Sequence, residues 1–185
     1  MNIQAEWNRI SPNLPPIAYL LKQAYPDRWV RFHNLPNSKR YPETETEYKT
    51  IIDRNETVLF SLIDKQAELI AFAPKYDDEN TDQPSFSEFN RLIAEPAHFG
   101  SVTSELDSEI SLNIYFAKFL TKHLPTLIRL VADEVLSNII LADFSAGILY
   151  HPYDGGMDFI LENKAKRDSL KARFSEWYPG STSGL

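Results

Sequence analysis

A chain of 185 residues, 43% of them hydrophobic and 12% aromatic, can bury a sizeable core in one domain, which excludes a disordered or fibrous protein. It contains no cysteine, so disulfide bonds, thiolate metal ligands and cysteine nucleophiles are excluded. The net charge of −7 opposes binding to nucleic acid, because charges of like sign slow the encounter of two molecules.

The negative charge is concentrated in one segment. Residues 77–110 contain nine acidic residues and a single basic one, Arg91. Because an acidic surface accelerates the encounter with a basic molecule, we expect partner-binding residues in this segment. The candidates follow one another in its first part: Asp77, Asp78, Glu79 and Asp82. The alternative is that these acids only keep the protein in solution.

The sequence also bears on the cellular compartment. Its first residues, MNIQAEWNRISPNLPP, lack the basic leader and apolar segment of a secretory signal. The longest apolar runs, such as 139–142, fall far short of the roughly 20 residues that cross a bilayer. We therefore expect a cytoplasmic protein with no membrane contact.

The first half of the chain predicts helices and strands in alternation. In order, they are a helix ending at Tyr25, a strand at 28–33, a helix at 43–64, a strand at 68–74, a polar loop at 75–85 and a short helix at 86–94. The helix at 43–64 has the clearest pattern, a single face of mostly apolar residues. That face comprises Tyr48, Ile51, Ile52, Asn55, Leu59 and Leu62.

The second half predicts a meander of strands between two helices. A strand at 108–119 precedes a helix at 125–137, for which Thr126 is the candidate N-cap. Three strands follow, at 138–144, 146–153 and 157–161, and then a helix capped by Asn163 that packs on the sheet through Leu170, Phe174 and Trp177.

This order of elements predicts an α+β fold. We expect one domain over residues 1–185, with a mainly antiparallel sheet, a C-terminal three-stranded meander and helices packed on the sheet. The ends at 1–14 and 179–185 are expected to be loosely ordered.

The stretch HPYDGGMDFI, residues 151–160, is the first candidate site. His151, Asp154 and Asp158 are residue types that bind metals or transfer protons, but a metal site needs further ligands that the sequence does not supply. Asp-Gly and Gly-Gly are also typical of hairpin turns, in which glycine supplies a positive φ. The pattern favours a turn over catalysis, and a partner-contact loop is the third alternative.

The stretch RFHNLPNSKRYPE, residues 31–43, is the second candidate. Its basic side chains, Arg31, His33, Lys39 and Arg40, lie around a proline turn and are suited to grip a phosphate or a carboxylate. The alternative is a solvated loop in which these cations pair with acids at the start of the next helix. Those acids are Glu43, Glu45 and Glu47.

Catalytic and cofactor motifs are absent from the sequence. There is no glycine-rich phosphate loop, and no serine stands in a nucleophile elbow. We therefore expect no catalytic residues, no metal and no cofactor.

The two candidate stretches together resemble a bacterial family catalogued as domain of unknown function 3885, over most of residues 28–178. In that family an arginine-bearing strand precedes a tyrosine-containing helix, and a Tyr-Asp strand end leads through a glycine turn to a second aspartate and a helix with a terminal tryptophan. The matching positions are Arg31, Tyr48, Tyr153, Asp154, Gly156, Asp158 and Trp177. Gly155 stands where the family commonly has arginine. The resemblance implies a small bacterial cytosolic protein, in a family of which some members resemble genes beside toxin or immunity loci.

Two functions follow as expectations. The first is a non-enzymatic acidic binding protein, such as an immunity-type inhibitor of a basic bacterial toxin, which binds through Asp77, Asp78, Glu79 and Asp82. The second is a small-ligand-binding protein or an enzyme that uses one cleft, provided that its residues converge in the fold. These residues are Arg31, Lys39, Arg40, Tyr153, Asp154 and Asp158.

Overall fold

The fold is built on one seven-stranded sheet. A computed structural model describes residues 1–76, 84–93, 95–103 and 111–178. The strands are β1 (Trp29–His33), β2 (Glu68–Tyr76), β3 (Ala97–Thr103), β4 (Ser111–Leu120), β5 (Ile140–Asp143), β6 (Ile148–Tyr153) and β7 (Gly156–Ile160). They lie in the order β1-β7-β6-β5-β2-β4-β3, and every pairing among them is antiparallel. The expected α+β fold with a C-terminal meander of β5, β6 and β7 is confirmed.

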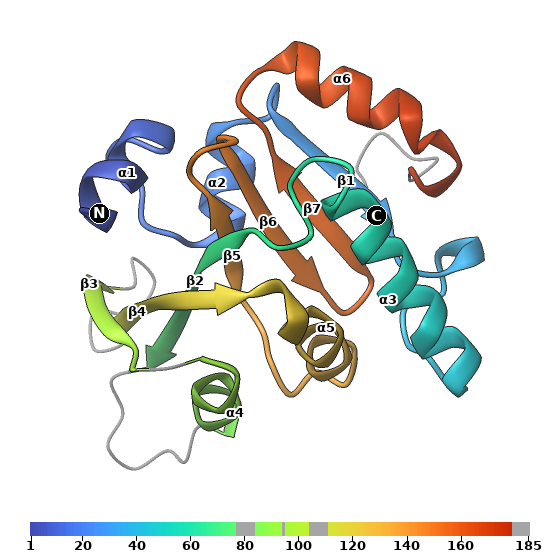
Figure 1. Ribbon diagram of the computed structural model, residues 1–185, viewed down its shortest axis with the longest axis horizontal. Coiled ribbons are helices and arrows are strands. Elements are labelled where there is room, and N and C mark those ends of the chain that lie inside the picture. The colour runs from blue at the N-terminus through green and yellow to red at the C-terminus, as the bar shows by residue number, and fades with distance from the viewer. Residues whose placement is uncertain (77–83, 94, 104–110, 179–185) are drawn as a thin grey trace.

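Helices cover both faces of the sheet (Figure 1). They are α1 (Ile3–Ile10), α2 (Ala18–Ala24), α3 (Glu45–Leu59), α4 (Pro84–Leu92), α5 (Leu124–Ala132) and α6 (Lys164–Arg173), with 3-10 turns at Pro36–Ser38, Thr121–His123 and Ser175–Trp177. Residues of α3, α4, α5 and α6 share one core with one face of the sheet, and residues of α1 and α2 share a second core with the other face. The strands therefore alternate between two apolar layers.

Local sequence signals explain where the long helices begin. Thr44 accepts a hydrogen bond from the backbone N–H of Glu47, and the Glu47 side chain accepts one from the backbone of Thr44, so a capping box starts α3. The predicted cap of the last helix is confirmed, because the Asn163 side chain accepts a hydrogen bond from the backbone of Lys166.

Several predicted boundaries were wrong. The helix predicted at 125–137 is α5, which begins at Leu124 after a 3-10 turn and ends at Ala132, so Thr126 lies inside the helix and is not its N-cap. Helix α3 ends at Leu59, five residues before the predicted end, and β2 continues past Pro74 to Tyr76.

Two elements are absent from the sequence prediction. Residues 1–14, expected to be a loose end, contain α1, whose Trp7 is fully buried and donates from Nε1 to the carbonyl of Leu14 at 2.6 Å. Strand β3 pairs with β4 through a register shift between His98 and Gly100, which breaks the alternation that marks a strand in sequence. The predicted loose end at 179–185 lies outside the described residues.

No helix in the described part of the chain is both long and apolar enough to span a membrane.

Candidate functional site

The candidate site lies at the hairpin that joins β6 to β7. Tyr153 pairs with Gly156, and the two residues between them form the turn. Asp158 lies between two neighbours in the sheet, with Arg31 of β1 opposite it on one side and His151 of β6 on the other. The sheet therefore brings the two candidate stretches of the sequence together.

Arg31 and Asp158 form a two-point ion pair. Arg31 donates from Nε to one carboxylate oxygen of Asp158 at 2.7 Å and from Nη2 to the other at 2.8 Å. The two side chains are only 13% and 9% exposed. If either partner were removed, water could not replace it, and the other charge would be left buried without a counter-charge. Both residues therefore contribute to the stability of the fold.

Tyr153 packs between this ion pair and the turn. The Arg31 guanidinium lies 4.3 Å from the centre of the Tyr153 ring. A Cβ added to Gly156 would lie 2.6 Å from the Tyr153 hydroxyl oxygen and 2.2 Å from the carbonyl oxygen of Phe32, so no larger residue fits there. Burial raises the pKa of the Tyr153 phenol, which therefore stays protonated at neutral pH.

The two hairpin glycines are needed for their small size and not for an unusual backbone conformation. Neither Gly155 nor Gly156 has the positive φ that the sequence predicted; among the described glycines only Gly147 does. Glycine is required at these positions because of close packing: the Tyr153 ring lies directly over both of them and leaves little room for a Cβ.

Asp154 is held in a second ion pair. One carboxylate oxygen accepts from Arg40 Nε at 2.6 Å, and the other accepts from the backbone N–H of Gly155 at 2.8 Å. Lys39 points elsewhere, because its ammonium group donates to Glu43 and Glu47 on the α3 side. Of the three loop cations, two therefore reach the hairpin and only Lys39 pairs with the acids that start the next helix.

A buried amide network fixes the hairpin to α3. The backbone N–H of Asn34 donates to the carbonyl of Gly155 at 3.1 Å. The Asn34 side-chain carbonyl accepts from Asn55 on α3 at 2.8 Å, and Asn55 in turn accepts from the Tyr150 hydroxyl at 2.7 Å. The sequence prediction did not include this network. Its one signal was Asn55, a polar residue within an otherwise apolar helix face.

His151 lies beside the ion pair in its neutral form. Burial lowers the pKa of its imidazole to about 4, with opposing charge effects from Asp158 and Arg31. Its Nδ1 and the Nε1 of Trp29 are buried atoms without a hydrogen-bond partner in the described chain. Both residues line a cavity of about 10 Å³ together with Asp158, which is room for roughly one water molecule.

Acidic side chains lie at the start of α3 and at the end of α5, and one of them, Glu134, lines a cleft with Arg40, Tyr153 and Asp154. We define the acidic rim as Glu43, Glu45, Glu47, Asp133 and Glu134. The rim is joined by contacts from the Tyr48 hydroxyl to Asp133, from Tyr41 to Glu134 and from Arg129 to Glu45. With Asp154, six carboxylates face three basic side chains: Lys39, Arg40 and Arg129. This surface is therefore net negative.

Two further sets of residues come from the sequence analysis: the family-motif position Trp177 and the predicted partner-binding acids. Trp177 packs against Phe174 and under the Arg54 guanidinium, and it lines a cleft with His33, the residue that pairs with Gly156. The four predicted partner-binding acids, Asp77, Asp78, Glu79 and Asp82, lie outside the described residues. Within the ranges that are described, no group of three or more His, Asp or Glu side chains is placed to hold a metal ion.

The fold and the site define a class: an α+β protein with a helix-covered antiparallel sheet and an arginine–aspartate hairpin at one end. The family described as "Domain of unknown function (DUF3885)" matches residues 17–180, and the chain belongs to that family. Comparisons with the curated proteins and with the solved structures find no match.

Proposed function

We propose that this chain is a non-enzymatic binding protein. The observation that carries the proposal is that the hydrogen-bonding capacity of the two hairpin carboxylates, Asp154 and Asp158, is already used within the chain. Both oxygens of Asp154 and both oxygens of Asp158 already accept hydrogen bonds from within the chain. A carboxylate that is fully engaged by arginine and backbone donors is a poor general base, because its protonation would break those bonds. The hairpin therefore serves as a rigid support.

The partner that fits this surface is a basic protein. The acidic rim is net negative, and Glu43 and Glu45 are among its most exposed side chains, at 78% and 79%. Tyr41 and Arg40, types that are common in binding hot spots, are exposed beside it. A negative surface of this kind speeds capture of a cationic partner. We include the predicted acids Asp77, Asp78, Glu79 and Asp82 in the same proposal.

The finer form of the proposal is an immunity-type inhibitor of a basic bacterial toxin, acting in the cytoplasm. Its support is the charge of the chain and the family resemblance to proteins beside toxin or immunity loci. Such an inhibitor gains from fast, charge-steered association, because the toxin must be captured before it acts.

The proposal can be tested by affinity capture. The immobilised protein and a rim variant, Glu45→Gln with Glu134→Gln, are exposed to a lysate of the source cell at low salt. The matched control, Glu162→Gln with Asp168→Asn, removes the same charge from α6 and the residues just before it. We expect a basic protein to bind the wild type and the control, to bind the rim variant more weakly, and to elute as salt rises toward about 0.5 M.

Two results would contradict the proposal. One is a captured protein that binds the rim variant and the control equally well. The other is a partner whose association rate does not change with salt, since association steered by exposed charges must slow when they are screened.

A second candidate is small-ligand binding beside the hairpin, and the convergence of the two sequence stretches favours it. A cleft of about 240 Å³ is lined by Arg40, His151, Tyr153 and Asp154, among others. A ligand bound there stabilises the native state. Inorganic phosphate, acetate and a nucleoside monophosphate are the probes: one of them should raise the melting temperature of the wild type but not of Arg40→Ala. No shift with any of them would count against this candidate.

A further inference from the structure

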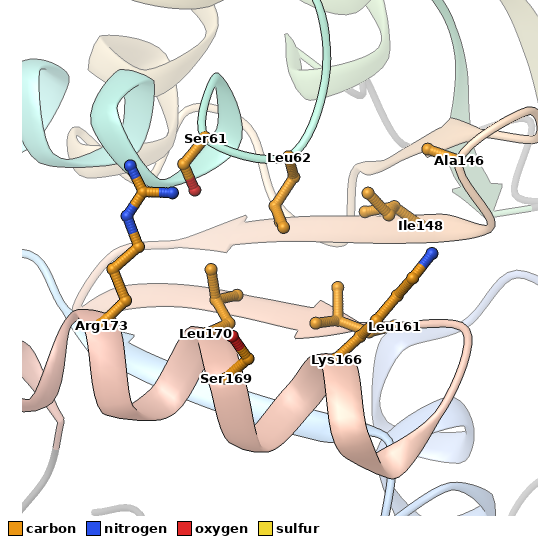
Figure 2. A pocket seen from close by; sticks show the side chains of 9 residues that line it. All are labelled: Ser61, Leu62, Ala146, Ile148, Leu161, Lys166, Ser169, Leu170 and Arg173. Atoms are coloured by element: carbon orange, nitrogen blue, oxygen red, sulfur yellow. The ribbon is translucent and has the colours of Figure 1, made fainter.

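A second cavity lies at the opposite end of β6 from the hairpin, between the end of α3 and helix α6. It has a volume of about 300 Å³, within the range of small-molecule sites. Its floor is apolar: in Figure 2, Leu62 and Leu170 point toward one another across it, and Ile148 and Leu161 lie to one side. Three of these four side chains, Ile148, Leu161 and Leu170, belong to the buried core.

Basic side chains stand at both ends of this cavity. Figure 2 shows Arg173 extending toward Ser61 at one end and Lys166 extending along Leu161 at the other, with Ser169 between them on α6. No acidic residue contributes to the lining. The cavity thus combines an apolar floor with positive charge and hydroxyl groups at its opening.

The two cations are available to an anion. Within the part of the chain that the structure describes, Lys166 pairs only with Glu162, at 2.6 Å, and both side chains are more than half exposed, so the pair is weak. Arg173 lies over the ring of Phe174 at 5.3 Å and lines a neighbouring cleft with Asp53 and Glu56, but among the described residues no carboxylate forms an ion pair with it.

From this arrangement we infer that the cavity between α3 and α6 binds a small carboxylate with an unbranched apolar tail, such as decanoate. The tail lies on Leu62, Ile148, Leu161 and Leu170, and the carboxylate meets Arg173 or Lys166 at the opening. This inference is independent of the proposed function, because the cavity shares no residue with the acidic rim or the hairpin.

Calorimetric titration with decanoate, below the concentration at which it forms micelles, tests the inference. Decanoate should bind about fifteenfold more tightly than octanoate, because it has two more methylenes and each buried methylene contributes roughly fourfold. Acetate, which has no tail, and decyltrimethylammonium, which has the opposite charge, should not bind measurably. Equal binding of decanoate and decyltrimethylammonium would overturn the inference.

Variants locate the site. Arg173→Gln should weaken decanoate binding about threefold, the effect of removing one exposed charge. Ser169→Phe, at an exposed position of α6, should abolish binding because the ring fills the cavity opening. Lys164→Gln removes a charge from α6 outside the cavity and is the matched control. Thermal melting of each variant must match that of the wild type, and undiminished binding by Ser169→Phe would place decanoate elsewhere and refute the site.

Discussion

At the scale of single residues, the hairpin side chains hold the fold together. Asp158 and Arg31 satisfy one another in a nearly buried pair, and Tyr153 lies over that pair and over Gly156. The sequence raised the question of whether these residues do chemistry or form a turn. Their contacts favour a structural role, and substitutions can separate the two.

Asp158→Asn should lower the free energy of unfolding by about 3 kcal/mol, because it leaves the Arg31 guanidinium in a poorly hydrated position without its counter-charge. Urea denaturation at neutral pH measures the effect. Asp168→Asn, on the exposed surface of α6, is the control and should change stability by less than about 0.5 kcal/mol. A loss at Asp158 no larger than that of the control would contradict a structural role.

His151 makes stability depend on pH. Its pKa is lowered from 6.5 to about 4 in the folded chain, so between these values the unfolded chain binds more protons. The free energy of unfolding should therefore fall as the pH falls from about 6.5 to about 4, by about 3 kcal/mol in the limit. In His151→Gln this part of the pH dependence should disappear, whereas His98→Gln, at an exposed position on β3, should retain it. Parallel wild-type and His151→Gln curves across this range would contradict the expectation.

Gly156→Ala should destabilise the protein by roughly 3 kcal/mol or more, because its Cβ would overlap the carbonyl oxygen of Phe32 and the hydroxyl of Tyr153. Gly100→Ala is the matched control, since a Cβ there meets nothing within 4 Å. Thermal melting distinguishes them: the first variant should melt well below the wild type and the second close to it.

At the scale of elements, helix α3 connects the core to the candidate site. Its apolar face packs into the larger core, its Asn55 supports the hairpin through Asn34, and its first turn carries part of the acidic rim. The capping box fixes where this helix begins, and therefore where Glu45 and Glu47 are placed.

Thr44→Ala should cost about 1 kcal/mol of unfolding free energy, because the backbone N–H of Glu47 loses its acceptor. Thr46→Ala, inside the first turn and exposed, is the control; alanine favours helix, so this change should be neutral or slightly stabilising. Chemical denaturation measures the unfolding free energy of both variants. Equal losses of unfolding free energy would show that the lost cap is not the cause of the destabilisation.

At the scale of the whole molecule, helices cover both faces of the sheet. On the face covered by α1 and α2, the packing of α1 depends on one side chain. Trp7 of α1 is fully buried, lies 4.8 Å from the ring of Phe72 between ring centres, and anchors α1 on the second core. Without it, little else of comparable size joins α1 to the sheet.

Trp7→Ala should destabilise the protein by about 4 kcal/mol, through lost burial and the cavity left behind. The amide hydrogen-exchange rates should rise most in residues 3–10, since α1 loses the side chain that anchors it. Tyr19→Ala, at a position 61% exposed on α2, serves as the control and should change neither measurement appreciably. If Trp7→Ala behaved like this control, the first helix would contribute little to the fold.

The sequence by itself determined the α+β class, the three-stranded meander, the cap at Asn163 and the hairpin between β6 and β7. These are local features: periodicity, a capping side chain and a two-residue turn act within about ten residues of chain. For the same reason it misplaced the ends of α3 and α5 and omitted β3, because a helix end and an edge strand depend on what packs against them.

Only the tertiary structure decided how the candidate residues are used. It pairs Arg31 with Asp158 and Arg40 with Asp154 across 127 and 114 residues of sequence, turns Lys39 toward Glu43 and Glu47, and buries Trp7 in a segment that reads as a loose end. Such contacts follow from strand order and register, which bring distant side chains together and which no local pattern specifies.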